Sequence, residues 1–170
     1  MKDIVLVELN AEEKQKAEEL SSLAAEIWTE HYLPIIGLPQ VEYMLKKYQS
    51  TEVILRDIST NGYRYFMAYY DGQLAGYCAA KPEVLSNSIF LSKLYVKKDY
   101  RGYGISRKML GKLLEIAQEN SMNHIWLTVN RHNGNSVSIY KKMGFKIVEE
   151  MVTDIGSGYV MDDYKMQLDI

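Results

Sequence analysis

Two patterns of apolar and polar residues follow one another along the first third of the chain. Residues 3–9 have the pattern of a strand, and apolar residues then recur at three- and four-residue steps over 11–31, which predicts a helix. A cluster of helix-breaking residues predicts a loop after this helix: Pro34, Gly37 and Pro39. A second helix is expected from about Gln40 to Lys47.

Ser50 is a candidate N-cap for a third, short helix from Thr51 to Ser59. The same segment contains apolar residues that also suit a strand: Val53, Ile54 and Leu55. Both alternatives stay open at this point.

The spacing changes after Asn61-Gly62. Residues 63–70 and 73–81 both have strand character, and Asp71-Gly72 lies between them. This dipeptide is a strong hairpin signal, because both turn positions need a positive φ. A third run, Ile89–Lys97, completes a predicted antiparallel meander.

Helices and strands alternate over the rest of the chain. The expected elements are a helix over 104–118, a strand over His124–Val129, a helix over 134–142 and two final strands over 145–152 and 158–168. The whole order predicts an α/β domain with a helical crossover between its fourth and fifth strands. No linker, repeat or low-complexity segment divides the chain.

Composition narrows the class of protein. The chain has 170 residues, of which 47% are apolar and 25% charged, with a net charge of -2, as in soluble globular proteins. Scattered Lys and Arg give no basic stripe for nucleic acid, and no apolar run approaches the roughly 20 residues of a membrane span. Cys78 is the only cysteine, which favours a reducing cytoplasm. We expect it to be buried and not a nucleophile.

A glycine-bearing loop precedes the helix at 104–118. Residues 101–107 (Arg-Gly-Tyr-Gly-Ile-Ser-Arg) join the end of a strand to a helix start, where free backbone N–H groups and the helix dipole favour an anion. Gly102 and Gly104 allow a phosphate to approach the backbone. Alone, the segment equally fits a turn that uses glycine only for conformation. It is not a P-loop, because Gly-Lys-Ser/Thr is missing.

A second motif follows about 30 residues later, at 133–145 (Asn-Gly-Asn-Ser-Val-Ser-Ile-Tyr-Lys-Lys-Met-Gly-Phe). Alone, it fits a capped helix with a buried tyrosine. In this order, the two motifs resemble the acetyl-CoA loop, Arg/Gln-x-x-Gly-x-Gly/Ala, and the Asn-x-x-Ala/Ser…Tyr-x-x-x-Gly-Phe signature of GNAT-superfamily N-acetyltransferases. Ser106 stands where that loop usually has Gly or Ala. The resemblance covers roughly residues 63–168.

This resemblance implies a GNAT fold: α/β, with a central mixed, mostly antiparallel, twisted sheet of about seven strands, helices on both faces and a V-shaped cofactor cleft between strands 4 and 5. It implies one N-acetyltransferase domain over 1–170, with acceptor-side helices in 1–62 and an acetyl-CoA-binding core in 63–170. Acetyl-CoA is the implied co-substrate, and no metal is expected. The implied cofactor contacts are Leu94, Tyr95, Val96, Arg101, Gly102, Tyr103, Gly104, Ile105, Ser106, Arg107, Asn133 and Lys142.

The resemblance also implies a bulge in the fourth strand. The implied reaction is direct attack of a neutral amine on the thioester, whose carbonyl is polarised by a backbone N–H of this bulged strand near Tyr95 or Val96. Tyr140 is the implied catalytic proton donor to the departing thiolate, since a phenol with a pKa of about 10 is protonated at neutral pH. The base stays open. Ser92 stands where some GNAT enzymes have a glutamate, which leaves a water chain at Ser92, Glu30 or His31 as alternatives.

The acceptor side of such a fold is formed by the first helices and the last hairpin. Candidate acceptor-pocket residues are Trp28, Glu30, His31 and Tyr32. With Tyr43, the aromatic rings would hold an ammonium by cation–π contact, although a core role for Trp28 and a structural role for His31 are the favoured alternatives. Similarity to polyamine-type acetyltransferases around 125–127 and 140–145 favours a small polyamine as the acceptor.

Three other functions stay open: a protein- or peptide-directed acetyltransferase, a non-catalytic CoA-binding regulatory module and a non-enzymatic interaction domain. The resemblance also implies a homodimer through the final strands. The expected protein is cytoplasmic, with a small-molecule amine as its partner and neither nucleic acid nor membrane.

Overall fold

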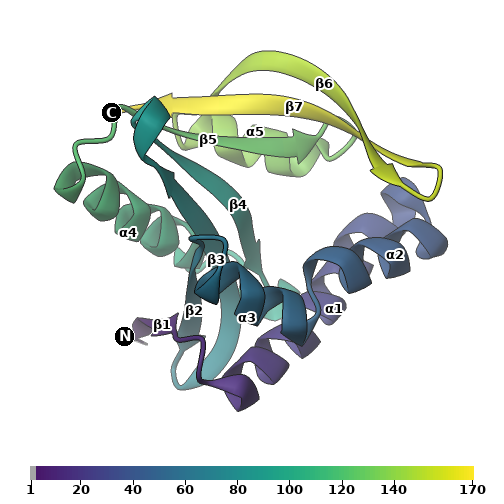
Figure 1. The fold of residues 1–170 in the computed structure, drawn as a ribbon, viewed down its shortest axis with the longest axis horizontal. Helices are drawn as coiled ribbons and strands as arrows, with labels where there is room; N and C mark the ends of the chain where they lie inside the picture. The colour runs from purple at the N-terminus through teal and green to yellow at the C-terminus, as the bar shows by residue number, and fades with distance from the viewer. Residues whose placement is uncertain (1–2) are drawn as a thin grey trace.

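A computed structural model describes residues 3–170 as one seven-stranded sheet with helices on both faces (Figure 1). The strands are β1 (Ile4–Leu9), β2 (Arg64–Tyr70), β3 (Gln73–Glu83), β4 (Ser88–Val96), β5 (His124–Asn130), β6 (Lys146–Gly156) and β7 (Tyr159–Asp169). The helices are α1 (Lys14–Ile36), α2 (Leu38–Tyr48), α3 (Thr51–Ser59), α4 (Ile105–Glu119) and α5 (Gly134–Lys142). The strand order is β1-β2-β3-β4-β5-β7-β6.

The first two helices are longer than the sequence predicts, and the predicted loop between them is wrong. α1 continues through Pro34 to Ile36, and only Gly37, with φ +81°, separates it from α2. Ile36 packs in an apolar cluster with Trp28, which favours the extra helical turn. Pro39 stands in the first turn of α2, where its missing N–H would have no helical partner in any case.

The segment 51–59 is helical, so the alternative of a strand is wrong. The Ser50 hydroxyl accepts a hydrogen bond from the Val53 backbone N–H at 3.4 Å, as the capping pattern predicts. Ile54 is the buried residue of this short helix, and it packs against the sheet with α1.

The predicted meander and its hairpin are confirmed. β2 and β3 pair antiparallel, and their turn places Asp71 at φ +50° and Gly72 at φ +80°. The later elements lie within a few residues of their predicted ranges. The β6–β7 hairpin is longer than expected, and its turn is confined to Ser157 and Gly158, at φ +53° and +80°.

The alternation of side chains along β2 explains the two layers of helices. Phe66 and Ala68 belong to the cluster that packs under α4, whereas Tyr65 and Met67 belong to the cluster under α1 and α3. Cys78 is fully buried in the first of these clusters, and burial raises the pKa of its thiol to about 12. This confirms the expectation of a buried cysteine.

A β-bulge lies in the middle of β4. Ala79 pairs with Lys93 and Ala80 pairs with Leu91, so Ser92 is the extra residue. The bulge reverses the side-chain alternation. Leu91 and Leu94 both join the α4 cluster, and Tyr95 turns to the face of α1.

β4 and β5 form the one parallel pair of the described sheet, and they separate soon after they meet. Their pairing covers Ser88–His124, Ile89–Ile125 and Phe90–Trp126. Beyond these pairs the strands diverge, as Figure 1 shows. The predicted GNAT fold class, with its opening between strands 4 and 5, is confirmed. Within residues 3–170, none of the helices combines the length and apolar character needed to cross a membrane.

Candidate active site

Two cavities meet where β4 and β5 part. The loop-side cavity, of about 500 Å³, lies between the two strands, the start of α4 and one face of α5. The helix-side cavity, of about 690 Å³, lies between α1–α3 on one side and β5 and β7 on the other. Both cavities are lined by the same residues at their border: Tyr32, Ser92, Tyr95 and Thr128.

The glycine loop forms one wall of the loop-side cavity. Gly102 and Gly104 have φ +86° and +88°, a conformation that favours glycine, and Gly104 is the N-cap of α4. The Lys108 N–H donates to the Gly104 carbonyl in the first helical hydrogen bond. The N–H groups of the first turn therefore lack helical partners, and together with Arg107 they suit an anion.

Arg101 ties this loop to β4 and to α1. Its Nε donates to the Val96 carbonyl at 3.0 Å, and its two terminal nitrogens donate to the Glu30 carboxylate at 3.0 Å each. One of them also lies 2.7 Å from His31 Nε2. Burial and the neighbouring guanidinium lower the pKa of His31. Glu30 and His31 thus hold the loop in place.

The structure places two of the candidate acceptor-pocket residues outside the helix-side cavity. His31 lines the loop-side cavity, and Glu30 lines neither, because its carboxylate is turned to Arg101. Trp28 and Tyr32 do line the helix-side cavity, and Trp28 is at the same time buried in an apolar cluster. Tyr43 lies outside the lining and donates its hydroxyl hydrogen bond to the Ile155 carbonyl.

Most of the residues expected at the cofactor line the loop-side cavity: Leu94, Tyr95, Val96, Arg101, Gly102, Gly104, Ile105, Ser106 and Arg107. Three others lie elsewhere. Tyr103 is exposed, with its ring 5.0 Å from that of Tyr70, and Lys142 is exposed at the end of α5. Asn133 caps α5 by accepting from the Ser136 N–H at 3.2 Å. Its effect on the cavity is through the placement of that helix.

One face of α5 lines the same cavity, and Tyr140 lies on it. Ser136, Ile139 and Met143, which the sequence did not identify as lining residues, recur with Tyr140 at three- and four-residue steps and lie on this face. This spacing was visible in the second motif. The other missed lining residues are Leu91, Tyr100, Leu127, Thr128, Val129 and Asn135.

Tyr140 lies on this face with its ring packed edge-on against Phe145 at 5.7 Å. Burial raises the pKa of its hydroxyl, which therefore keeps its proton throughout the neutral range. At the border of the cavities, the hydroxyls of Tyr32 and Tyr95 are hydrogen-bonded at 3.1 Å.

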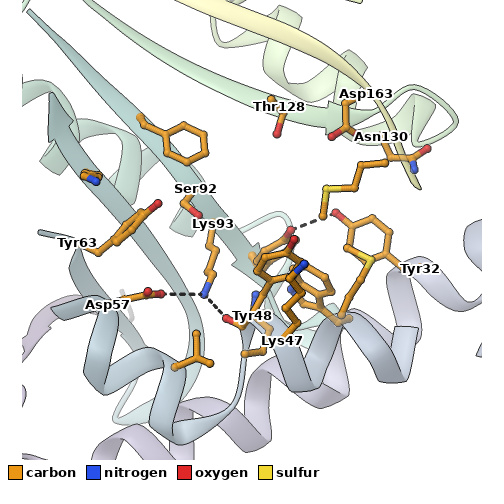
Figure 2. Close-up of a pocket in the computed structure, with 18 of the residues that line it drawn as sticks. Tyr32, Lys47, Tyr48, Asp57, Tyr63, Ser92, Lys93, Thr128, Asn130 and Asp163 are labelled. Carbon is orange, nitrogen blue, oxygen red and sulfur yellow. Dashed lines mark hydrogen bonds and ion pairs between the residues drawn. The ribbon is translucent and has the colours of Figure 1, made fainter. Parts of the chain in front are cut away.

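The helix-side cavity has a carboxylate on one wall. Figure 2 shows Asp163, Asn130 and Thr128 on the β5–β7 side, opposite Lys93 and Asp57. Asp163 is 9% exposed, and burial followed by the charge of Asp162 raises its pKa to about 6. This residue was not among the candidates from the sequence. Its signal was the alternation Tyr159, Met161, Asp163, which places a carboxylate on an inward strand face.

Lys93 is the buried cation of the opposite wall, and it was also missed. Its ammonium donates to the Tyr48 carbonyl and the Tyr65 hydroxyl at 2.6 Å each and lies 3.9 Å from Asp57. Burial lowers its pKa to about 8. Within residues 3–170, no three or more His, Cys, Asp or Glu side chains gather as a metal site would require.

Comparison with known protein families matches residues 19–145 to the Acetyltransferase (GNAT) family. The chain belongs to this GNAT acetyltransferase family. It is an N-acetyltransferase, and its acyl donor is acetyl-CoA.

Among its relatives is a spermidine N(1)-acetyltransferase from Thermoplasma acidophilum, 28% identical over 149 residues, which cover 85% of this chain and 89% of that enzyme. A streptothricin acetyltransferase from Streptomyces lavendulae is 31% identical over 75 residues, 44% of this chain and 40% of that one. The PaiA N-acetyltransferase of Thermoplasma acidophilum, solved in complex with coenzyme A, shares the fold with a TM-score of 0.78. It is 24% identical, and the alignment covers 99% of both chains.

Proposed function

We propose that this GNAT enzyme transfers the acetyl group of acetyl-CoA to a primary amine of a small molecule. The observation that carries this proposal is the junction of the two cavities at Tyr32, Ser92, Tyr95 and Thr128. A thioester held between the parted strands would face an amine held in the helix-side cavity. The helices α1–α3 and the β7 wall then form most of the acceptor side, and residues between Leu91 and Met143 form most of the donor side.

The loop-side cavity fits the donor. The N–H groups at the start of α4, with Arg107, would hold its pyrophosphate, and the open edge of β4 from Leu94 to Val96 would accompany the pantetheine arm. Arg101 acts by fixing the loop, since Val96 and Glu30 already occupy its guanidinium. Asn133 acts by capping the helix that carries Tyr140.

Bound acetyl-CoA supplies the thioester that the amine attacks. Tyr140 holds a proton on its hydroxyl in the neutral range and donates it on the thiol side of the cleft. Asp163 receives the incoming ammonium on the other side. Its raised pKa makes it a better proton acceptor than an ordinary aspartate. Asp163 is therefore our candidate for the general base that deprotonates the amine.

The names of relatives suggest where to look for the acceptor. Spermidine and spermine acetyltransferases are among them, so polyamines are the first amines to test. Thiol release from acetyl-CoA would be followed with spermidine, putrescine, amino acids, a streptothricin-type antibiotic and short peptides. We expect release that depends on a small primary amine. Release with peptides alone would favour a protein-directed enzyme, and donor binding without any release would favour a regulatory module.

We also propose that two copies associate through the final strands. β6 lies at the edge of the sheet, and it carries the exposed apolar side chains Val148 and Val152. Light scattering coupled to size exclusion should give the mass of a dimer. The mass of a single chain across the micromolar range would contradict this.

A further inference from the structure

The charge of the helix-side cavity does not suit a plain polyamine. Four of its lining residues are cationic, and two are carboxylates: Lys47, Arg56, Lys81 and Lys93, against Asp57 and Asp163. The low-dielectric walls of a cavity concentrate the electric field of the charged side chains that line it. This excess of positive charge therefore favours binding of an anionic group. A polyamine would bring several further positive charges into this space.

The two carboxylates are not equally available to a ligand. Asp57 accepts hydrogen bonds from the Tyr65 hydroxyl at 2.8 Å and the Asn61 amide at 3.2 Å, and lies 3.9 Å from Lys93. The Asp163 carboxylate has no hydrogen bond or ion pair within residues 3–170, although the residue is largely buried. It is therefore the carboxylate that an ammonium can reach.

Three of the cations have no carboxylate within ion-pairing distance among the described residues. The Lys47 ammonium donates to the Ile155 carbonyl and lies over the Tyr48 ring at 5.4 Å. The Lys81 ammonium lies over the Tyr63 ring at 5.5 Å. Arg56, at the end of α3, is exposed, so its guanidinium is accessible from the cavity.

These charges lie on opposite sides of the cavity. Figure 2 shows Asp163 on the β7 side, and Lys47 and Lys93 on the side of the helices. Asp163 lies on the wall that leads to the loop-side cavity. Its partner across the strands, Asn130, lines this wall together with Thr128, which lies at the border of the two cavities. Arg56 is in the last turn of α3, and Lys81, near the end of β3, lies over the Tyr63 ring just beyond that helix, so both cations come from one end of the cavity.

We propose that the acceptor is an amine that also carries an anionic group, with its reacting nitrogen at Asp163 and its anion at Arg56 and Lys81. This rests on the proposed function and narrows its substrate class. A guanidinium and an ammonium suit a carboxylate or a phosphate equally well in charge, and the guanidinium can bind either in a bidentate manner.

Matched pairs of amines test the proposal, because each pair differs only in the anion. The values of kcat/KM would be compared for lysine and cadaverine, for ornithine and putrescine, and for phosphoethanolamine and ethanolamine. We expect at least a tenfold preference for the anionic member in the carboxylate pairs or in the phosphate pair. The pair with the larger preference identifies the anion.

Failure of this inference is distinct from failure of the proposed function. Equal use of the two members of every pair, or preference for the member without the anion in all three pairs, would overturn the anionic acceptor and leave a small-molecule acetyltransferase. No transfer to any amine would overturn both.

A double variant, Arg56→Gln with Lys81→Gln, locates the anion site. Its preference for the anionic amine should fall at least tenfold, mainly through KM, while acetyl-CoA still raises its melting temperature and so shows a folded enzyme. Lys112→Gln removes one charge from α4, away from both cavities, and should keep the preference. An unchanged preference in the double variant would overturn the assignment to Arg56 and Lys81.

Discussion

Burial acts on three titratable side chains around the junction of the cavities, and in each case it favours the neutral form. It raises the pKa of Tyr140 and of Asp163, and it lowers the pKa of Lys93. A neutral phenol can donate a proton, and a carboxylate of raised pKa can accept one. The Tyr140 assignment stays a prediction that only kinetics can test.

Replacing Tyr140 by phenylalanine should lower kcat at least tenfold, since loss of a general acid typically costs about 10²–10⁴-fold in rate. The ring and its contact with Phe145 remain, so the Kd for acetyl-CoA should stay within a few-fold. Steady-state kinetics and calorimetric titration measure both. An unchanged kcat would mean that another group supplies the proton, and a raised Kd alone would make Tyr140 a packing residue.

Replacing Asp163 by asparagine should lower kcat/KM for the amine at least tenfold and remove its decline below about pH 6, where the carboxyl becomes protonated. Because the folded pKa is raised above the unfolded value, ionisation of Asp163 disfavours the fold as pH rises through the interval from 3.8 to about 6. The variant should therefore melt higher than the parent at pH 8, and at the same temperature below pH 3.8. A pH profile that keeps its acid limb in the variant would exclude Asp163 as its source.

At the scale of the element, the bulge at Ser92 decides which β4 side chains meet which layer. The GNAT resemblance implied a bulge in this strand, but local spacing could not place it at Ser92, because a bulge is a property of pairing and β4 alone shows no turn signal. Helix spacing did predict α4 and α5, since their apolar residues recur locally. The prediction of a loop at Pro34 was wrong, because α1 continues past this proline to Ile36, which packs against apolar residues of other elements.

Two glycines in regular elements should respond in opposite ways to alanine. A Cβ at Gly76 would lie 2.5 Å from the Tyr95 carbonyl oxygen, on a central strand that cannot give way. Gly76→Ala should therefore destabilise the fold by about 1–3 kcal/mol. Gly111→Ala, on α4, meets no atom within 4 Å and should stabilise by about 0.5–1 kcal/mol. Urea unfolding measures both. A Gly76→Ala protein as stable as the parent would mean that β3 and β4 are less closely packed than described.

At the scale of the whole molecule, the two cavities bring together residues that are far apart in the chain. Arg101 meets Glu30 across 71 positions, and Asp163 shares a cavity with Trp28. Local spacing can show which face of an element is buried, but not which distant side chain lies opposite. The motifs therefore predicted many of the residues that line the loop-side cavity, whereas the positions of Asp163 and Lys93 and the contacts of Glu30 became visible only in the fold.

Acetyl-CoA should stabilise the whole domain, because it binds only the folded chain. At about 100 times its Kd, expected in the micromolar range, the gain is about 2.7 kcal/mol, or roughly 5–10 °C in melting temperature. Gly104→Glu should abolish this shift by placing bulk and negative charge at the anion site. Gly104→Ala carries the same strain from φ +88° without the charge and should keep a shift. If both variants respond as the parent does, the glycine loop does not contact the donor.

The short pairing of β4 with β5 leaves unpaired strand edges inside the sheet. The unpaired backbone N–H and C=O groups at such edges can form hydrogen bonds with any extended chain, including a segment of another, partly unfolded molecule. The donor's pantetheine arm would lie along the open edge of β4 and cover its unpaired backbone groups. The free enzyme should then aggregate faster on storage than the same enzyme kept with coenzyme A, and the preparation would keep best with this product present.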